Sequence, residues 1–541
     1  MFACAALGAC TNNDIVENEN NHPVAGSKAY MGVKLALPSE GMGRAATDGG
    51  YTNGTTAEQV IKNIQFVFYN ADGSFNAIGE TASTVTLTPQ TNGSNVEAIA
   101  DAVIALKTSE TNFPTQVIAF VNGAPTELVN KTLSEAMTLT TNAIDGQNDL
   151  GTTEKTKAFL MTNSTYYDKE VKVATPVDAR NFYETEESAK GNPVSIYVER
   201  LAAKVEIKEG ANLTNNINEI EDATGKKLQF VIDGYGLNAI NKSAYYLKNI
   251  ENYGFSSTTD WSVNWNNAGN FRCFWATDPN YTNGTYPSNP ANIADGDALK
   301  YYSYDNIVGN NKAAQYCLEN TMTADVYAAN GFKATTHALV VGHYTIDNKE
   351  VDENTFFYMY GNQSYLESDL IKMMATAEKV IYTRSGSGTE ADPYKYATID
   401  PSYYEIVRAT DKGADKVTIA LKAEGAPTEL YKKGQDKYEL VDLAAANASI
   451  ENYVGTADAY FEGKAYFPVA IEHFGKEGKT GEFGVVRNHY YELTINSIKN
   501  LGTGIYDPEE EIIPVPDGKT YYVGATLNIL SWKKVSQSVD L

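Results

Sequence analysis

The feature of this sequence that most constrains its fold is the alternation of apolar and other side chains with a period of two. Every odd position from Met31 through Val33 and Leu35 to Leu37 is apolar, and Pro38 ends the run. Side chains of a strand point alternately to its two faces, so this segment predicts a strand with one buried face. The same alternation recurs along the chain. It therefore predicts a mainly all-β protein that contains only short helices.

Further strands follow from the same pattern and from turn signals. Asp72-Gly73 closes a hairpin behind Ile64, Phe66 and Phe68, and 117–121 is a continuously apolar strand that ends at Asn122-Gly123. Two segments have helical spacing instead, at 128–137 and 366–382. The second begins an excursion from the strand pattern, and 278–311 reads as an inserted loop. Other strands are expected at 228–232, 338–346, 356–360, 465–471 and 490–498.

A change of phase near Glu199 predicts a domain boundary. Val194, Ile196 and Val198 alternate on even positions, whereas the residues after Arg200 alternate on odd ones. A slip of one residue exchanges the two faces of a strand, as happens when a strand leaves one sheet at a bulge and joins another. We therefore expect domains at 45–199 and 200–541.

The N-terminus has the pattern of a lipidated export signal. Leu7-Gly8-Ala9 places an apolar residue three positions before Cys10 and small residues between them, which is what lipid attachment to the cysteine thiol requires. Only nine residues without Lys or Arg precede Cys10, so we expect that translation starts upstream and that 1–27 is a truncated signal and tether. The polar run from Thr11 to Asn21 suits a tether; a chance cysteine is the alternative.

Residues 28–44 read as a strand that proteolysis removes. Arg44 follows this strand and precedes Ala45, so we expect cleavage between the two. Removing a strand with one buried face would uncover an apolar slot and unpaired backbone, which is a template for another strand. The mature chain is then expected to begin at Ala45.

The C-terminus offers a strand for such a slot. Alternation from Val523 to Ile529 is interrupted at Trp532, and apolar residues then return at Val535, Val539 and Leu541. The tail at about 533–541 is therefore a candidate donor strand for a neighbouring copy. The alternative is an ordinary edge strand of its own domain.

Composition argues against several other functions. The chain has 541 residues with a net charge of −25 and no basic cluster, which disfavours nucleic acid as a partner. No apolar run approaches the roughly 20 residues of a membrane-spanning helix. The five histidines form no recognisable metal or catalytic set, so we expect no enzyme activity, metal or cofactor. Cys273 and Cys317 flank the inserted loop, and either a disulfide or two buried thiols fits them.

Five sequence blocks resemble a known family. VSIYVERLAAKVEI, FRCFWATDPNYT, YCLENTM, AYFPVAIEHF and FGVVRNHYYELTINSIKNLGTG are similar to recurring blocks of the major fimbrial subunit (fimbrilin) family of type V pili, in the branch of Mfa-like minor-fimbria stalk subunits. The resemblance implies two transthyretin-like, Greek-key β-sandwich domains with short helical insertions. It also implies lipidation at Cys10, a precursor carried to the outer membrane, and processing at Arg44 by an arginine-specific protease.

The functional expectation follows from this resemblance together with the two ends of the chain. We expect a structural pilin, the major subunit of a cell-surface fimbria, that polymerises by protease-triggered donor-strand exchange and supports adhesion and biofilm formation. Its partners would be other copies of itself and accessory, anchor and tip subunits. The alternative is a tip or accessory adhesin whose Tyr-rich loops around 281–304 bind a surface ligand. A donor-like tail favours the stalk, because a tip subunit need not donate a strand.

Overall fold

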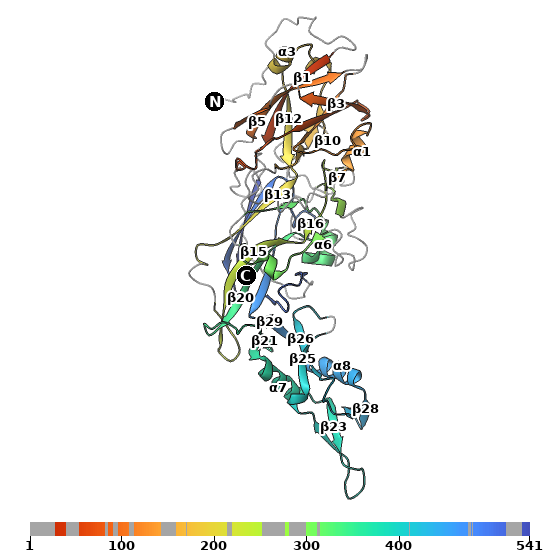
Figure 1. Cartoon of the computed structure of the whole chain (residues 1–541), viewed down its shortest axis with the longest axis vertical. Coiled ribbons are helices and arrows are strands. Elements are labelled where there is room, and N and C mark those ends of the chain that lie inside the picture. Colours follow the sequence, from red (N-terminus) through yellow and green to blue (C-terminus); the bar gives the residue numbers. More distant parts are fainter. Residues whose placement is uncertain are drawn as a thin grey trace, which may run out of the picture.

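The computed structural model describes residues 28–38, 53–81, 85–89, 96–107, 113–141, 158–168, 170–213, 219–250, 276–280, 299–310, 314–409, 412–473, 478, 480–514 and 533–540. These residues form an elongated molecule with three successive parts: an N-terminal sandwich, a central sandwich and a distal lobe (Figure 1). The architecture is mainly β, as the alternation predicted.

The N-terminal sandwich is built around a closed ring of strands. The path β1-β12-β8-β6-β2-β3-β5 returns to β1, because β1 pairs with both β12 and β5. Its core contains aromatic and aliphatic side chains such as Phe66, Phe68 and Met161. The elements are β1 (Lys28–Pro38), β2 (Ile64–Tyr69), β3 (Phe75–Thr81), β4 (Thr86–Pro89), β5 (Val96–Lys107), β6 (Gln116–Val121), α1 (Leu133–Met137), β7 (Thr140–Thr141), β8 (Met161–Asn163), β9 (Tyr166–Asp168), β10 (Glu170–Lys172), β11 (Thr175–Pro176), η1 (Ala179–Asn181), α3 (Glu186–Gly191) and β12 (Val194–Arg200).

The chain passes from the first sandwich to the second at Leu201. β12 belongs to the N-terminal ring, whereas β13 (Ala202–Glu209) pairs with β19 and runs parallel to β31. The central sandwich packs this sheet against β14-β15-β20-β30-β32. Its other elements are β14 (Glu219–Glu221), β15 (Lys227–Asn238), β16 (Ile240–Asn241), β17 (Ala244–Tyr245), β18 (Leu299–Lys300), α5 (Tyr304–Ile307), β19 (Gln315–Leu318), α6 (Ala324–Asn330), η5 (Gly331–Lys333), β20 (His337–Ile346), β30 (Lys464–Ala470), β31 (His489–Ser497), β32 (Thr503–Gly504) and β33 (Lys533–Asp540).

The distal lobe lies between β20 and β30 in sequence and has a core of its own. Two helices, α7 and α8, contribute Leu370, Met374 and Ile450 to this core, which also contains Val417 and Ile419 from a five-stranded sheet. The elements are β21 (Phe356–Tyr360), β22 (Gln363–Leu366), α7 (Glu367–Ala377), β23 (Ile381–Ser385), β24 (Lys395–Thr398), η6 (Pro401–Tyr403), β25 (Tyr404–Arg408), β26 (Lys416–Leu421), β27 (Leu430–Lys433), β28 (Tyr438–Val441), α8 (Leu443–Val454) and β29 (Ala457–Phe461).

Both predicted helices are shorter than their apolar spacing indicated. Residues before Thr132 are not helical, because Asn130 has φ 63° and Thr132 caps the helix with its side chain, so α1 begins at Leu133. α7 ends at Ala377, and the carboxylate of Glu378 accepts from the amides of Val380 and Ile381, where β23 begins. The part of 366–382 after Lys379 is therefore turn and strand.

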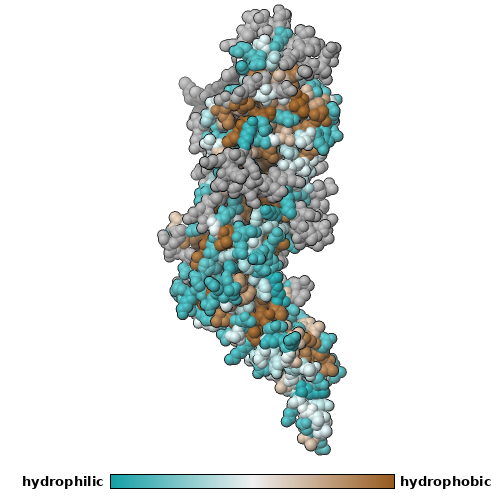
Figure 2. Space-filling model, viewed as in Figure 1, coloured by the Kyte–Doolittle hydropathy of each residue, from teal (hydrophilic) through white to brown (hydrophobic). Residues whose placement is uncertain are grey.

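The surface differs between the parts of the molecule. In the view of Figure 2, hydrophobic residues gather over the N-terminal sandwich and in part of the distal lobe, whereas the central sandwich is mostly hydrophilic. No helix among the residues that the structure describes is long and apolar enough to span a bilayer.

Candidate assembly site

β1 occupies the position that closes the N-terminal ring. Its residues run antiparallel to β5 from the pair Lys28↔Lys107 to the pair Pro38↔Val96, and Val33 to Ala36 also run parallel to Val194 to Tyr197 of β12. In its C-terminal half, β1 therefore pairs with a neighbouring strand along both of its edges. In the N-terminal half, the amide of Tyr30 donates to the carbonyl of Tyr183 at 2.7 Å, and the amide of Tyr183 donates back at 2.8 Å.

The inward face of β1 is part of the core. Ala29, Met31 and Val33 have exposed fractions of 0%, 0% and 1%, and they belong to the same core cluster as Phe66, Ile104 and Val198. Full burial of a Met or Val side chain contributes about 1.5–3 kcal/mol relative to its exposure. Removal of β1 would therefore leave both an apolar slot and the unpaired edges of β5 and β12.

The outward face of β1 is covered by α3 at Gly32. A Cβ atom built on Gly32 would lie 1.9 Å from the carbonyl oxygen of Ala189 and 3.3 Å from the Cα of Pro193. Both are backbone atoms, so no side-chain rotation relieves the collision. α3 begins at Glu186, where Thr185 caps it through the amide of Ser188, and this short helix fixes the position of the Ala189 carbonyl. Only glycine fits at this register of the strand.

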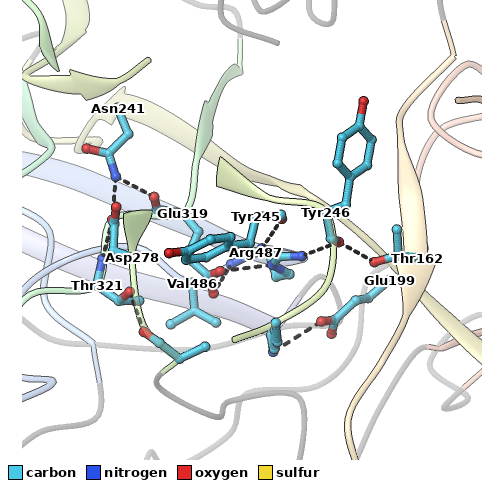
Figure 3. Close-up of polar contacts among 12 residues, drawn as sticks. Thr162, Glu199, Asn241, Tyr245, Tyr246, Asp278, Glu319, Thr321, Val486 and Arg487 are labelled. Atoms are coloured by element: carbon cyan, nitrogen blue, oxygen red, sulfur yellow. Dashed lines mark hydrogen bonds and ion pairs between the residues drawn. The ribbon is translucent and has the colours of Figure 1, made fainter. Parts of the chain in front are cut away.

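A buried polar cluster holds one wall of the slot against the central sandwich (Figure 3). Arg487, just before β31, donates from Nη1 to the carbonyl of Tyr246 at 3.0 Å and from Nε to Glu319 at 2.9 Å. The hydroxyl of Thr162 in β8 donates to the same Tyr246 carbonyl at 2.7 Å. This carbonyl therefore joins the two sandwiches through buried hydrogen bonds.

The end of β12 carries further charges into the same cluster. Glu199 pairs with Lys248 at 3.2 Å, and both side chains are fully buried. Burial raises the pKa of Glu199, although Lys248 and Arg487 act in the opposite direction. Arg200 pairs with Glu97 at the start of β5, and its Nη1 donates to Asn488 at 3.2 Å. β5 and β12, the two strands that flank β1, are thus joined to each other by an ion pair.

The carboxyl groups of Glu58 and Asp278 show how burial and hydrogen-bond partners together set pKa values in this region. Burial alone would raise the pKa of Glu58, but Lys204, Tyr316 and Arg200 together hold that pKa below its usual value. Asp278 accepts hydrogen bonds from Asn241, Asn280 and Thr321, yet burial raises its pKa to about 7. The partners of Glu58 therefore stabilise its charge, and because Lys204 and Tyr316 belong to the central sandwich, this contact also joins the two sandwiches. The hydrogen bonds to Asp278 do not offset the effect of burial on its charge.

The structure places the predicted residues of the removable strand together on β1. Met31 and Val33 point into the core, and Leu35 and Leu37 continue the strand in register with Ala100 and Ala98 of β5. Cys10, Arg44 and Ala45 lie outside the described residues. Lipidation at Cys10 and cleavage after Arg44 therefore stay predictions.

The predicted donor residues lie at an edge of the central sandwich. Val535 and Val539 belong to β33, which pairs in parallel with β31 opposite Tyr491 and Ile495. Among the described strands, β33 is the edge strand of its sheet. Leu541 lies outside the described residues.

The cysteine and histidine predictions concern residues away from β1. Cys317 is buried, and burial raises the pKa of its thiol, while Cys273 lies outside the described residues. His343 pairs with Asp233 at 2.7 Å and with Glu350 at 3.0 Å. Among the described residues, no group of three or more His, Cys, Asp or Glu side chains could hold a metal ion.

The sequence analysis did not predict that Gly32 lies against the backbone of α3. Gly32 interrupts a strand pattern that is otherwise rich in large residues, and a glycine inside a strand indicates the close approach of another backbone. This signal was available, but the sequence did not identify Ala189 as the neighbour. The Tyr30 and Tyr183 bridge carries no sequence signature.

Comparison with known proteins gives one family match. The family model "Major fimbrial subunit protein type IV, Fimbrillin, C-terminal" matches residues 458–538, which include β30, β31 and most of β33. No curated protein matches the chain.

The chain is also similar, at low sequence identity, to solved structures of cell adhesion and fimbrial proteins. A candidate cell adhesion protein from Bacteroides eggerthii DSM 20697 has 13% identity and a TM-score of 0.29, with 96% of this chain and 100% of that chain covered. A second one, from Parabacteroides distasonis ATCC 8503, has 13% identity and a TM-score of 0.31, with 94% and 98% covered. The tip fimbrial protein Mfa3 from Porphyromonas gingivalis, truncated at its C-terminus, has 12% identity and a TM-score of 0.27, with 68% and 98% covered.

Proposed function

We propose that this chain, whose residues 458–538 match the fimbrillin C-terminal family model, is a structural stalk subunit of a cell-surface fimbria that polymerises when proteolysis releases β1. Each subunit would then receive a strand from the next copy in the slot between β5 and β12. Fimbriae built in this way would support adhesion and biofilm formation. This is a structural function and requires no catalytic group.

The observation that supports the proposal is the double pairing of β1. The strand has backbone partners on both sides and its inward side chains in the core, so the ring is incomplete without it. Residues 39–52, which include Arg44, join β1 to the rest of the sandwich. One cut in this segment would leave β1 attached by non-covalent contacts alone, and an equivalent strand could then replace it.

The route to the cell surface is part of the proposal. The precursor would carry lipid on Cys10 and reach the outer membrane. An arginine-specific protease would then cut after Arg44 and separate the sandwich from its lipid anchor. Partner subunits would be copies of this chain together with accessory, anchor and tip proteins.

The test compares two arginine variants of the full chain. Arg44→Ala should give a folded monomer that an arginine-specific protease does not convert into polymer, whereas Arg180→Ala is the control because Arg180 is 83% exposed and lies outside the slot. Polymers are measured as ladders on unboiled gels, and their subunits should begin at Ala45 by N-terminal sequencing. Normal polymerisation of Arg44→Ala, with subunits that still contain β1, would contradict the proposal.

A further inference from the structure

One position of the slot in the N-terminal sandwich accepts only glycine, and this restricts which strands can replace β1. At the position of Gly32 a Cβ atom would stand 1.9 Å from the Ala189 carbonyl oxygen and 2.7 Å from its carbon. Any strand that replaces β1 in the same direction meets the same obstacle. A suitable strand therefore has glycine at this position and apolar residues at the positions of Met31 and Val33.

Near its C-terminus, the chain repeats the pattern of β1. Tyr30-Met-Gly-Val-Lys-Leu-Ala-Leu37 aligns without gaps with Tyr522-Val-Gly-Ala-Thr-Leu-Asn-Ile529. Gly524 then stands at the position of Gly32, and Val523 and Ala525 stand at the positions of the buried Met31 and Val33. Leu527 and Ile529 take the places of Leu35 and Leu37. The match ends where Tyr521 takes the place of Ala29 and Leu530 that of Pro38.

The segment after Trp532 does not fit in this way. If Val535, Val539 and Leu541 point inward, the position of Gly32 falls to an even-numbered residue such as Lys534, Ser536, Ser538 or Asp540, each of which has a Cβ atom. Val535 and Val539 also belong to β33, which already pairs with β31 of its own chain.

We propose that the strand received by the slot is Tyr522–Ile529 of a second copy, in the direction of β1, and that the Ala189 carbonyl sets its register by admitting only Gly524. The inference rests on the proposed function and names the partner segment of the same site. It assigns the donor to the segment before Trp532 instead of the tail at 533–541.

The first experiment compares two valine variants of the full chain. Gly524→Val should reduce the rate of polymer formation after arginine-specific cleavage by about tenfold or more, because the added side chain must displace the α3 backbone. Thr526→Val is the matched control, since Thr526 takes the place of Lys34, which already has a side chain. Melting of the uncleaved proteins should be unchanged, because β1 still fills the slot.

The register is tested by disulfide formation between copies. Lys34 lies opposite Asp101 of β5, so Thr526→Cys in one copy and Asp101→Cys in another should form a dimer bridge under oxidation. Asn528→Cys with Asp101→Cys is the matched control, displaced by two residues, and it should not form the bridge.

The outcomes separate this inference from the proposed function. If Gly524→Val polymerises like the unaltered chain while deletion of 535–541 abolishes polymers, the tail is the donor: the glycine inference is wrong and the proposed function stands. If both variants polymerise normally and β1 remains in the subunits, both fail. A bridge from Asn528→Cys in place of Thr526→Cys would overturn the register.

Discussion

Met31 gives a quantitative test of how β1 is held before cleavage. Its side chain is fully buried between the two walls of the N-terminal sandwich, and the strand is paired on both sides of this region. Met31→Ala removes apolar volume from a packed core, which typically costs about 2–5 kcal/mol. After cleavage, the same loss would weaken the retention of β1 by about 30-fold or more.

Two measurements check this expectation. Denaturant unfolding of the uncleaved protein should show the lower free energy of unfolding, and Met31→Ala should polymerise faster than the unaltered chain once cleaved, because its β1 leaves sooner. Lys34→Ala is the control, since Lys34 lies on the opposite face and is only half-buried. The reasoning is refuted if Met31→Ala leaves both the unfolding free energy and the polymerisation rate unchanged.

Three further predictions concern the surroundings of the slot and the central sandwich. Gly32→Val should destabilise the uncleaved protein by about 1–3 kcal/mol in denaturant unfolding, since it meets the α3 backbone, but should leave finished polymers, which lack β1, as stable as before. Glu97→Gln leaves the buried Arg200 without its carboxylate and should cost about 3–5 kcal/mol in the same assay, whereas Asp178→Asn, in an exposed pair, should change little. Hydrogen bonding to Asp233 raises the pKa of His343, so the stabilisation from its protonated form is complete below the unfolded pKa of about 6.5 and is lost as pH rises through the folded value. His343→Gln should therefore lower the melting temperature at pH 5.5 and have a smaller effect at pH 9, and equal effects at both pH values would contradict this assignment.

The strands were predictable because burial on one face leaves a direct trace in the sequence. β1, β21 and β31 lie where alternation placed them, within a few residues at each end. The helices were less predictable, because apolar spacing does not reveal where a chain turns. Residues 128–132 have helical spacing, yet the positive φ of Asn130 and the cap at Thr132 delay the helix.

The candidate site was predictable in part for the same reason. The inward face of β1 follows from alternation, whereas its neighbours β5 and β12 come from sequence positions far from it and from each other. The contact between Gly32 and Ala189 depends on the approach of a short helix, and the ion pair of Glu97 with Arg200 depends on ring closure. Such contacts between distant residues leave no periodic pattern in a single sequence.

The long register between β1 and β5 has a mechanical consequence. Its paired residues extend from Lys28 to Pro38, with the hydrogen bonds across the strand axis. A donated strand in this position that is pulled along its own axis is loaded in shear, so the bonds of the ladder share the force and must fail together. A fibre of such subunits would resist tension through the number of bonds in each joint, and Tyr522–Ile529 would set the force at which neighbouring subunits separate.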